Sequence, residues 1–341
     1  MSEPVNQTAL LPWQHTQFNR LHALWSNDRL AHAWLLTGKP GIGKLEFAQH
    51  MARHLFCRKS TPQGPCGACQ DCHLFQAGTH PDWLLLQPEL RQLKIEMIRD
   101  AIEFAQNTAQ RNGAKVIVIK PAEAMNNNSA NALLKTLEEP TARTFLFLIS
   151  EQPGLLLPTL RSRCQLLEFP APPQEQAMQW LQTANVAADK AAFYLQLAHG
   201  APLHALHLAQ QQAELGFEVL LTTLQALIGG KTTPVQAAKK CEELGIRTSI
   251  DYQLLSVAGM LSAVQAGTTL PIPGLQSLMT LCNAGSGVSM IRRLHGLYQN
   301  LVQARQTAMA VNNANPQLMQ EALFAEWSNL AVTGRPSRST G

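Results

Sequence analysis

The sequence predicts an α/β protein in which a parallel sheet carries helices on both faces and is followed by purely helical regions. Three observations support this prediction. Short apolar runs alternate with helix-forming segments through the first half of the chain. A glycine-rich loop joins the first apolar run to a helix within residues 32–45. From about residue 212 onward, segments rich in Leu and Ala continue without a run typical of a strand.

The first elements follow from their apolar patterns. Residues 1–31 are expected to be a helical lead-in, because their apolar side chains fall on one helical face. The run AWLL at residues 33–36 predicts a buried strand. The segment at residues 45–56, which contains alanine and leucine, predicts the helix that follows the glycine loop.

The remaining strands of the sheet are predicted by further apolar runs, at residues 83–86, 116–119, 145–149 and 166–169. Two helices lie between them. One places Ile95, Ile98 and Ile102 at helical spacing, and the other is expected to be capped by Ser129 and stopped by Pro140. Because each strand is apolar throughout, we expect a parallel sheet that is covered on both faces.

Composition divides the chain into domains. The turn-forming sequence PAPP after the last predicted strand indicates a linker. The expected regions are an α/β P-loop domain at residues 1–169 with a cysteine insert at 57–72, a small helical domain at 170–211, a larger helical domain at 212–333, and a flexible tail at 334–341. Segments rich in Gly and Pro, including residues 271–274 and 285–287, separate the helices of the larger domain.

Composition also limits the class of protein. The chain has 341 residues, of which 45% are hydrophobic, so it can bury sizeable cores. A net charge of +4 is only weak support for contact with nucleic acid. The N-terminus does not resemble a signal peptide, and no run approaches the length of a membrane span. We therefore expect a cytoplasmic protein with thiols rather than disulfides, in which the isolated cysteines are core or partly buried thiols: Cys164, Cys241 and Cys282.

The glycine-rich loop GKPGIGK is a P-loop, the turn whose backbone N–H groups cradle nucleotide phosphates at the start of a helix. The candidate nucleotide-binding residues are Gly38, Gly41, Gly43 and Lys44. The pattern requires Ser or Thr next, because that hydroxyl ligates Mg²⁺. Here the position is Leu45, which has no ligand atom.

A second part of the magnesium chemistry is also missing. A P-loop ATPase needs an acidic pair after a later strand, and the strand at residues 116–119 is the obvious candidate. It is followed by Lys120 and Pro121, and Glu123 lies out of register. We therefore expect no ATP hydrolysis. Nucleotide binding without hydrolysis stays open, and the alternative is a loop that keeps its shape and binds nothing.

The cysteine insert has the spacing C-x8-C-x2-C-x2-C, which places four thiols within sixteen residues: Cys57, Cys66, Cys69 and Cys72. Four sulfur ligands suit a tetrahedral structural Zn²⁺ site. An iron–sulfur cluster is the rival, but a ferredoxin-like run requires cysteine where this chain has Gln76. His73 and His80 are alternative ligands, although a histidine in such a loop is more often simply polar.

The third motif is Ser162-Arg163-Cys164, in a polar turn. An arginine in such a turn is usually a solvated charge. Since this chain lacks its own metal chemistry, Arg163 has no evident use within its own ATPase site. The sharper hypothesis is an arginine finger supplied in trans, which stabilises charge at the γ-phosphate of a neighbouring subunit.

The segment NALLKTLEEP at residues 131–140, followed by Ser162-Arg163-Cys164, resembles the clamp-loader branch of the AAA+ proteins. The degenerate P-loop and the four-cysteine insert narrow the resemblance to the non-hydrolysing stator subunit of the bacterial DNA polymerase III clamp loader. The resemblance covers about residues 10–210 well and the C-terminal helical region more loosely.

This resemblance implies an AAA+ core, a helical lid at residues 170–211 and a collar at 212–333 that packs with other subunits. It implies gamma or tau and delta subunits as partners, in a DNA-directed DNA polymerase (a nucleotidyltransferase complex) that uses ATP to load a sliding clamp onto primed DNA. Arg163 would reach a gamma site, and Ser150 falls near the sensor-1 position. Leu203 stands where the sensor-2 arginine is expected.

Two other functions compete with this one. An active P-loop enzyme, either an ATPase or a nucleotide kinase, is opposed by Leu45 and Lys120. A zinc-dependent nucleic-acid-binding module is opposed by the insert itself. Between its cysteines the insert has only Arg58 and Lys59 as cations and no aromatic residue, so it is a poor platform for stacking bases.

Overall fold

A computed structural model describes residues 9–88, 92–111, 113–266, 274–282, 287–309 and 315–330. The chain forms two compact units, one of Met1–Ala184 with Gly200–His204 and the other of Asn185–His199 with Ala205–Gly341. The division falls inside the region expected to form the small helical domain. The predicted tail at 334–341 lies outside the described residues, as do most of the separators expected at 271–274 and 285–287.

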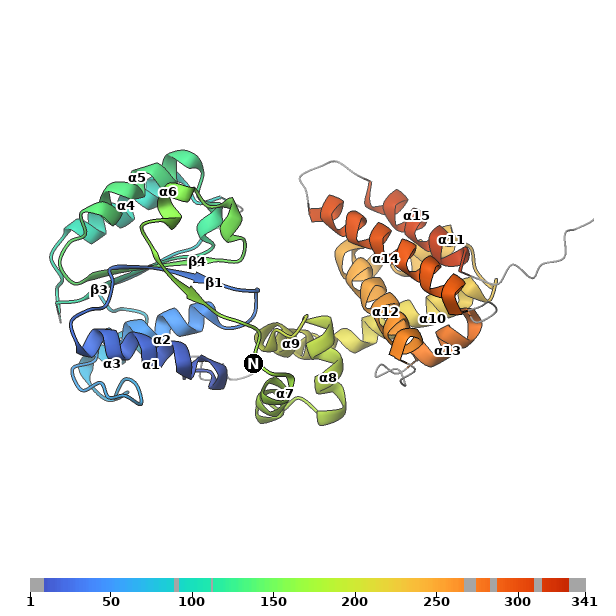
Figure 1. Ribbon diagram of the computed structural model, residues 1–341, viewed down its shortest axis with the longest axis horizontal. Coiled ribbons are helices and arrows are strands. Elements are labelled where there is room, and N and C mark those ends of the chain that lie inside the picture. The colour runs from blue at the N-terminus through green and yellow to red at the C-terminus, as the bar shows by residue number, and fades with distance from the viewer. Residues whose placement is uncertain are drawn as a thin grey trace, which may run out of the picture. The chain divides into compact units, whose positions relative to one another are not determined.

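A five-stranded sheet is the centre of the first unit (Figure 1), and its strand order is β2-β3-β4-β1-β5. All four neighbouring pairs are parallel. The strands are β1 (Ala33–Thr37), β2 (Trp83–Leu86), β3 (Lys115–Ile119), β4 (Thr144–Ser150) and β5 (Gln165–Glu168). The predicted parallel α/β fold is therefore confirmed, and β1, which leads into the glycine loop, lies between β4 and β5.

Helices cover both faces of the sheet, with α1, α2 and α3 on one side and α4, α5 and α6 on the other (Figure 1). Leu35 of β1, Ile117 of β3 and Leu146 of β4 are buried against the second group. The helical elements of this unit are η1 (Pro12–Gln14), α1 (His15–Ser26), α2 (Lys44–Phe56), α3 (Gln70–Gln76), α4 (Ile95–Gln106), η2 (Ala122–Ala124), α5 (Asn127–Glu138), η3 (Pro153–Leu155), α6 (Pro158–Arg161) and α7 (Gln174–Thr183).

Burial differs between the central and edge strands. Every residue of β1, β3 and β4 is buried, as expected for strands that are covered on both faces. In β5 only Leu167 is buried, and Leu166 is 48% exposed. The prediction that each strand is apolar throughout does not hold for β5, because this strand contains Gln165 and Glu168 and pairs on one side only, at the edge of the sheet.

The N-terminal cap of α5 also differs from expectation. The cap is Asn126, whose Oδ1 accepts a hydrogen bond from the backbone N–H of Ser129 at 2.8 Å. Ser129 therefore lies within the first turn, where its side chain is buried. The expected end of the helix is confirmed, because α5 stops at Glu138, before Pro140.

In the described residues, the second unit is built from helices alone. Trp327 donates from Nε1 to Oε1 of Gln253 at 2.9 Å, which joins α15 to α12 through buried polar atoms. None of the described helices combines the length and the apolar character needed to cross a membrane. The remaining elements are α8 (Ala188–Leu197), α9 (Pro202–Gln210), α10 (Ala213–Ile228), α11 (Pro234–Lys240), η4 (Glu242–Leu244), α12 (Ile246–Ala266), α13 (Leu275–Cys282), α14 (Gly287–Met309) and α15 (Pro316–Ser328).

A cluster of histidines lies where α1 packs on α2. Nδ1 of His22 and Nε2 of His54 are 3.0 Å apart, and the ring of Phe18 meets His54 edge-on with the ring centroids 5.1 Å apart. His54 is fully buried. This burial lowers the pKa of His54 to about 4, and the neighbouring His22 and His50 add to the shift. His54 is therefore neutral in the folded protein near pH 7.

This pKa predicts that the protein loses stability in weak acid. In the unfolded chain His54 has its ordinary pKa of 6.5, whereas in the folded chain its pKa is about 4. Between these two values a proton therefore binds the unfolded chain in preference to the folded one. We expect a loss of ~2 kcal/mol in the free energy of unfolding between pH 7.5 and pH 5 from this residue. Urea unfolding at the two pH values measures it. His54→Gln should reduce the pH dependence by that amount, whereas the exposed His15→Gln should not. Equal slopes in all three proteins would contradict the assignment.

Candidate functional site

The glycine loop has a backbone conformation that suits only glycine. Gly41 and Gly43 have φ of +72° and +91°, in the left-handed region. A Cβ on Gly41 would lie 2.7 Å from the Cβ of His204. A Cβ on Gly43 would lie 2.3 Å from a methyl carbon of Leu11. The loop thus keeps the P-loop shape, and neighbouring parts of the first unit pack closely against it.

Lys44, the first residue of α2, folds back onto the loop. Its Nζ donates to the carbonyl oxygen of Gly38 at 2.8 Å and to that of Lys39 at 2.6 Å. Burial lowers the pKa of Lys44 to about 8, with Glu151 opposing the shift and Lys120 adding to it. The ammonium group that would contact a phosphate is therefore bonded to the carbonyls of its own loop.

Other segments of the first unit bond to the same loop. The indole of Trp13, the amide of Gln14 and the backbone of Leu203 each donate a hydrogen bond to one of its carbonyls. These bonds are Trp13 Nε1 to Ile42 O at 2.9 Å, Gln14 Nε2 to Gly43 O at 2.6 Å and Leu203 N to Gly41 O at 3.0 Å. The roles of Trp13 and Gln14 were missed in the sequence, because nothing local links η1 to a loop almost thirty residues away.

The acidic residue near the loop has a structural partner. Oε1 of Glu123, in η2 after β3, accepts hydrogen bonds from the backbone N–H groups of Glu151 at 2.9 Å and Gln152 at 3.2 Å. It therefore holds the backbone that follows β4. Ser150, at the end of β4, is fully buried, and its Oγ has no hydrogen-bond partner in the described part of the chain. Lys120, rather than an acid, follows β3 directly.

The insert brings its four cysteines together. Their sulfur atoms, from Cys57, Cys66, Cys69 and Cys72, all lie within 4.8 Å of one another. Sulfurs at the corners of a tetrahedron around Zn²⁺, each at about 2.3 Å, would be about 3.8 Å apart. The distance between Cys69 Sγ and Cys57 Sγ in the structure is 3.9 Å. The cluster could therefore hold a metal ion with four sulfur ligands.

The four thiols differ in how readily they ionise. Backbone N–H groups of Ala68 and Cys69 lower the pKa of the exposed Cys66 to about 6. Burial raises the pKa of Cys72 to about 12. A cation is thus needed to bring all four to the thiolate form. The two histidines considered as substitutes are not members of the cluster. His73 is exposed, and His80 stacks on Phe56 with the ring centroids 3.9 Å apart.

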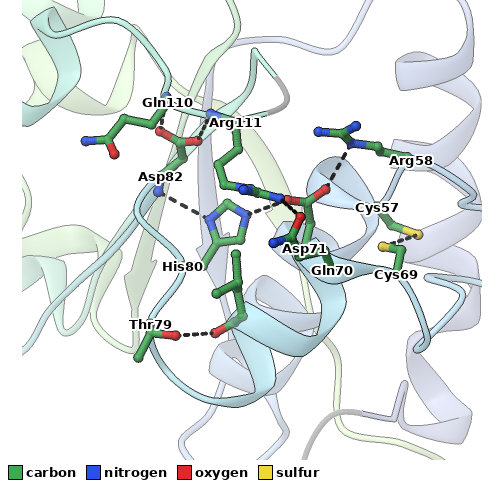
Figure 2. A network of polar contacts seen from close by, with 11 residues as sticks. Cys57, Arg58, Cys69, Gln70, Asp71, Thr79, His80, Asp82, Gln110 and Arg111 are labelled. Atoms are coloured by element: carbon green, nitrogen blue, oxygen red, sulfur yellow. Dashed lines mark hydrogen bonds and ion pairs between the residues drawn. The ribbon is translucent and has the colours of Figure 1, made fainter.

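Between two of these cysteines lies Asp71, the centre of a network that the sequence did not reveal (Figure 2). Its buried carboxylate accepts from Nε of Arg111 at 2.7 Å and from Nε of Arg58 at 3.2 Å. Burial opposes its ionisation, but the bond from Arg111 and the nearby positive charges lower the pKa of Asp71 below its usual value. Asp71 is therefore a carboxylate near neutral pH.

The network continues to the sheet through Asp82, just before β2. Its carboxylate accepts from the backbone N–H groups of Gln110 at 2.8 Å and Arg111 at 2.9 Å, and its own N–H donates to Nδ1 of His80 at 3.2 Å (Figure 2). Arg111 thus joins Asp71 in α3 to Asp82 beside β2. This network fixes the insert to the core of the first unit independently of any metal.

The structure pairs Arg163 with Glu138, the last residue of α5. Arg163 donates from Nε at 2.8 Å and also from Nη2 to the same oxygen, Oε1 of Glu138. Its Nη1 donates to the carbonyl oxygen of Thr159 at 2.8 Å. The Arg163 side chain is 34% exposed. The two sequence segments that carried the resemblance therefore meet here. The sequence did not reveal this partner, because Glu138 lies 25 residues away and no local pattern indicates the pair.

Comparisons with known proteins point to one family. Residues 13–173 match the family model described as DNA polymerase III, delta subunit. The chain is 33% identical to DNA polymerase III subunit delta' of Pseudomonas aeruginosa over 95% of this chain and 99% of that one. It is 32% identical to the Escherichia coli protein of the same name over 90% of this chain and 92% of that one. Among solved structures, a DNA polymerase III gamma-subunit-related protein from Thermotoga maritima aligns at 17% identity with a TM-score of 0.44, over 92% of this chain and 99% of that one.

Proposed function

This chain belongs to the DNA polymerase III delta' family, and from that premise we propose that it is a non-hydrolysing stator of the clamp loader. In this role it assembles with the gamma or tau and delta subunits, and the complex uses ATP to place the sliding clamp on primed DNA. This family membership agrees with the resemblance inferred from the degenerate P-loop and the four-cysteine insert. The chain contributes to catalysis through a neighbour's site rather than its own.

The main support for this proposal is that the P-loop of this chain lacks groups needed for ATP hydrolysis. Lys44 is bonded to two carbonyls of the loop, and Leu45 offers no atom to a magnesium ion. Two of the three N–H donors of Lys44 are used by these carbonyls, so a bound phosphate would find one free donor where a P-loop lysine normally turns its ammonium group to the phosphate. Glu123, the acid that follows β3 out of register, accepts hydrogen bonds from two backbone N–H groups. Each of these features disfavours an active ATPase, and together they also disfavour nucleotide binding.

Arg163 is the group through which this subunit would act on a neighbour. It lies in the turn between α6 and β5, with its guanidinium part-exposed. Since Lys44 and Leu45 leave this chain's own site without metal chemistry, an arginine that serves catalysis must serve another subunit. A guanidinium beside a γ-phosphate stabilises the charge that develops on it during transfer to water.

The cysteine cluster is proposed to hold one structural Zn²⁺ ion. The donor set of four sulfurs within 4.8 Å of one another fits the tetrahedral preference of zinc, and the spacing does not continue as a ferredoxin run. The ion would keep the thiolates together and fix Cys57, the C-terminal cap of α2, to Cys69, the N-terminal cap of α3. Its role would be stability of the insert, without part in the chemistry of ATP.

The helical regions are proposed to serve as lid and collar, at residues 170–211 and 212–333. In α10, Leu215 and Val219 are 55% and 42% exposed, and their spacing of four places them on one face of the helix. Such exposed apolar side chains suit a helix that packs against other subunits. This surface supports the proposal of assembly through the second unit.

Metal analysis tests the zinc proposal. Purified protein should contain one zinc per chain, and Cys69→Ser should lower the zinc content and the thermal stability of the insert, because three thiolates cannot close the tetrahedron. The sheet should remain folded, since the Asp71 network holds the insert without the metal. Cys282→Ser, which removes a buried thiol far from the cluster in sequence, is the control and should keep the zinc. Iron, or no metal at all, would refute this assignment.

ATP turnover by the isolated protein tests the proposed inactivity. We expect none above background, because the magnesium ligand and the second acidic position are both missing. Leu45→Thr alone should not create activity, since Lys120 still stands where a carboxylate is needed. Turnover that disappears in Lys44→Ala would show that this P-loop is catalytic after all.

Stimulated ATP hydrolysis in a reconstituted complex tests the finger. Arg163→Ala should leave folding and assembly unchanged and lower hydrolysis stimulated by clamp and DNA, while gamma subunits keep their own fingers. A finger contributes roughly 10³–10⁵ at the site it faces, but only one site of several is affected, so total turnover should fall by that site's share. Arg163→Lys should rescue poorly, because a point charge lacks the planar fork. A wild-type rate for the alanine variant would show that Arg163 is a solvated surface charge and not a finger.

A further inference from the structure

We propose that Glu138 is a positioning residue for Arg163, holding its guanidinium in the orientation that a neighbour's phosphate requires. The inference rests on the proposed function, since it concerns the same finger. It starts from the one ion pair that joins the end of α5 to the turn before β5. The pair orients the arginine for use in trans, rather than merely neutralising a surface charge.

The donors of Arg163 are only partly used. A guanidinium carries five N–H donors in a fixed planar fork. Nε and Nη2 each give one to Glu138, and Nη1 gives one to the carbonyl of Thr159. This leaves one N–H on each terminal nitrogen. Two such donors match two oxygens of one phosphoryl group, which is the bidentate arrangement that arginine makes with phosphate. The contacts with Glu138 and Thr159 therefore fix the plane of the group and leave donors available.

Both partners stand on backbone that is anchored in the core. Leu137 directly precedes Glu138 and is buried in the cluster beneath α5. Leu160, in α6, is fully buried in the same cluster and follows Thr159, whose carbonyl oxygen accepts the bond from Arg163. The carboxylate and the carbonyl that hold the guanidinium are thus placed by packed side chains. An arginine side chain released from both would sample many rotamers.

The exposure of the pair indicates orientation rather than stability as its role. The side chain of Glu138 is 50% exposed and that of Arg163 is 34% exposed. Ion pairs at this exposure contribute little to folding, because water screens them. Removing Glu138 should therefore leave the fold and the assembly intact and change mainly where the guanidinium points. Preorganised donors contribute to catalysis because they need no reorganisation when charge develops.

The experiment compares variants in the complete reconstituted complex, with ATP hydrolysis stimulated by clamp and primed DNA. Glu138→Ala should lower kcat by most of the loss that Arg163→Ala causes, with KM for ATP unchanged. Glu138→Gln keeps an acceptor oxygen without the charge, so it should recover part of the rate. Glu139→Ala is the matched control: it removes the same charge from the next position, which is also exposed, and should keep the wild-type rate. The double variant Glu138→Ala/Arg163→Ala should be no slower than Arg163→Ala alone.

The outcomes separate this inference from the function on which it rests. A wild-type rate for Arg163→Ala would overturn the finger and this inference with it. The positioning role alone would be overturned if Arg163→Ala loses activity as expected but Glu138→Ala has the same rate as the Glu139→Ala control. A Glu138→Ala rate above wild type would also overturn it, because Glu138 would then restrain the arginine. A double variant slower than Arg163→Ala would show that Glu138 acts by another route.

Discussion

The two hydrogen bonds from Lys44 to the carbonyls of its own loop determine how the rest of this subunit can work. They use two of the three N–H donors of the ammonium group and hold it against its own loop. Trp13, Gln14 and Leu203 then bond to the carbonyls that follow in the same loop. The P-loop is thus a joint at which η1, β1 and the start of α9 meet. A joint of this kind favours one fixed arrangement of the first unit, which is what a stator requires.

A single helix links this joint to the cysteine cluster. Lys44 is the first residue of α2, and Cys57 is its C-terminal cap. At the far end, the Asp71 network ties the insert back to β2 through Arg111 and Asp82. The helix is therefore held at both ends by groups that are unrelated to hydrolysis. The shape of the P-loop is therefore supported by contacts other than those with a nucleotide or a metal ion.

The parts of the structure that the sequence predicted are those set by local pattern. β2 spans the predicted residues, and the four cysteines converge because their spacing within one short insert leaves little choice. What the sequence did not reveal depends on the order of strands and on distant partners. The exposure of β5 follows from its place at the edge of the sheet, and Glu138 meets Arg163 only because α5 and α6 lie on the same face. Asp71 could have been noticed as a carboxylate between two cysteines, but its partner Arg111 could not.

The most direct test of the account compares Lys44→Ala with Arg163→Ala in otherwise identical reconstituted complexes, with ATP hydrolysis stimulated by clamp and primed DNA as the measurement. In an ordinary ATPase subunit the P-loop lysine is needed for turnover at its own site. Here we expect complexes with Lys44→Ala, matched for composition, to hydrolyse ATP at the wild-type rate, and those with Arg163→Ala to be slower. A loss of turnover with Lys44→Ala together with a wild-type rate for Arg163→Ala would contradict it, because this subunit would then be acting through its own site and not through its neighbour's.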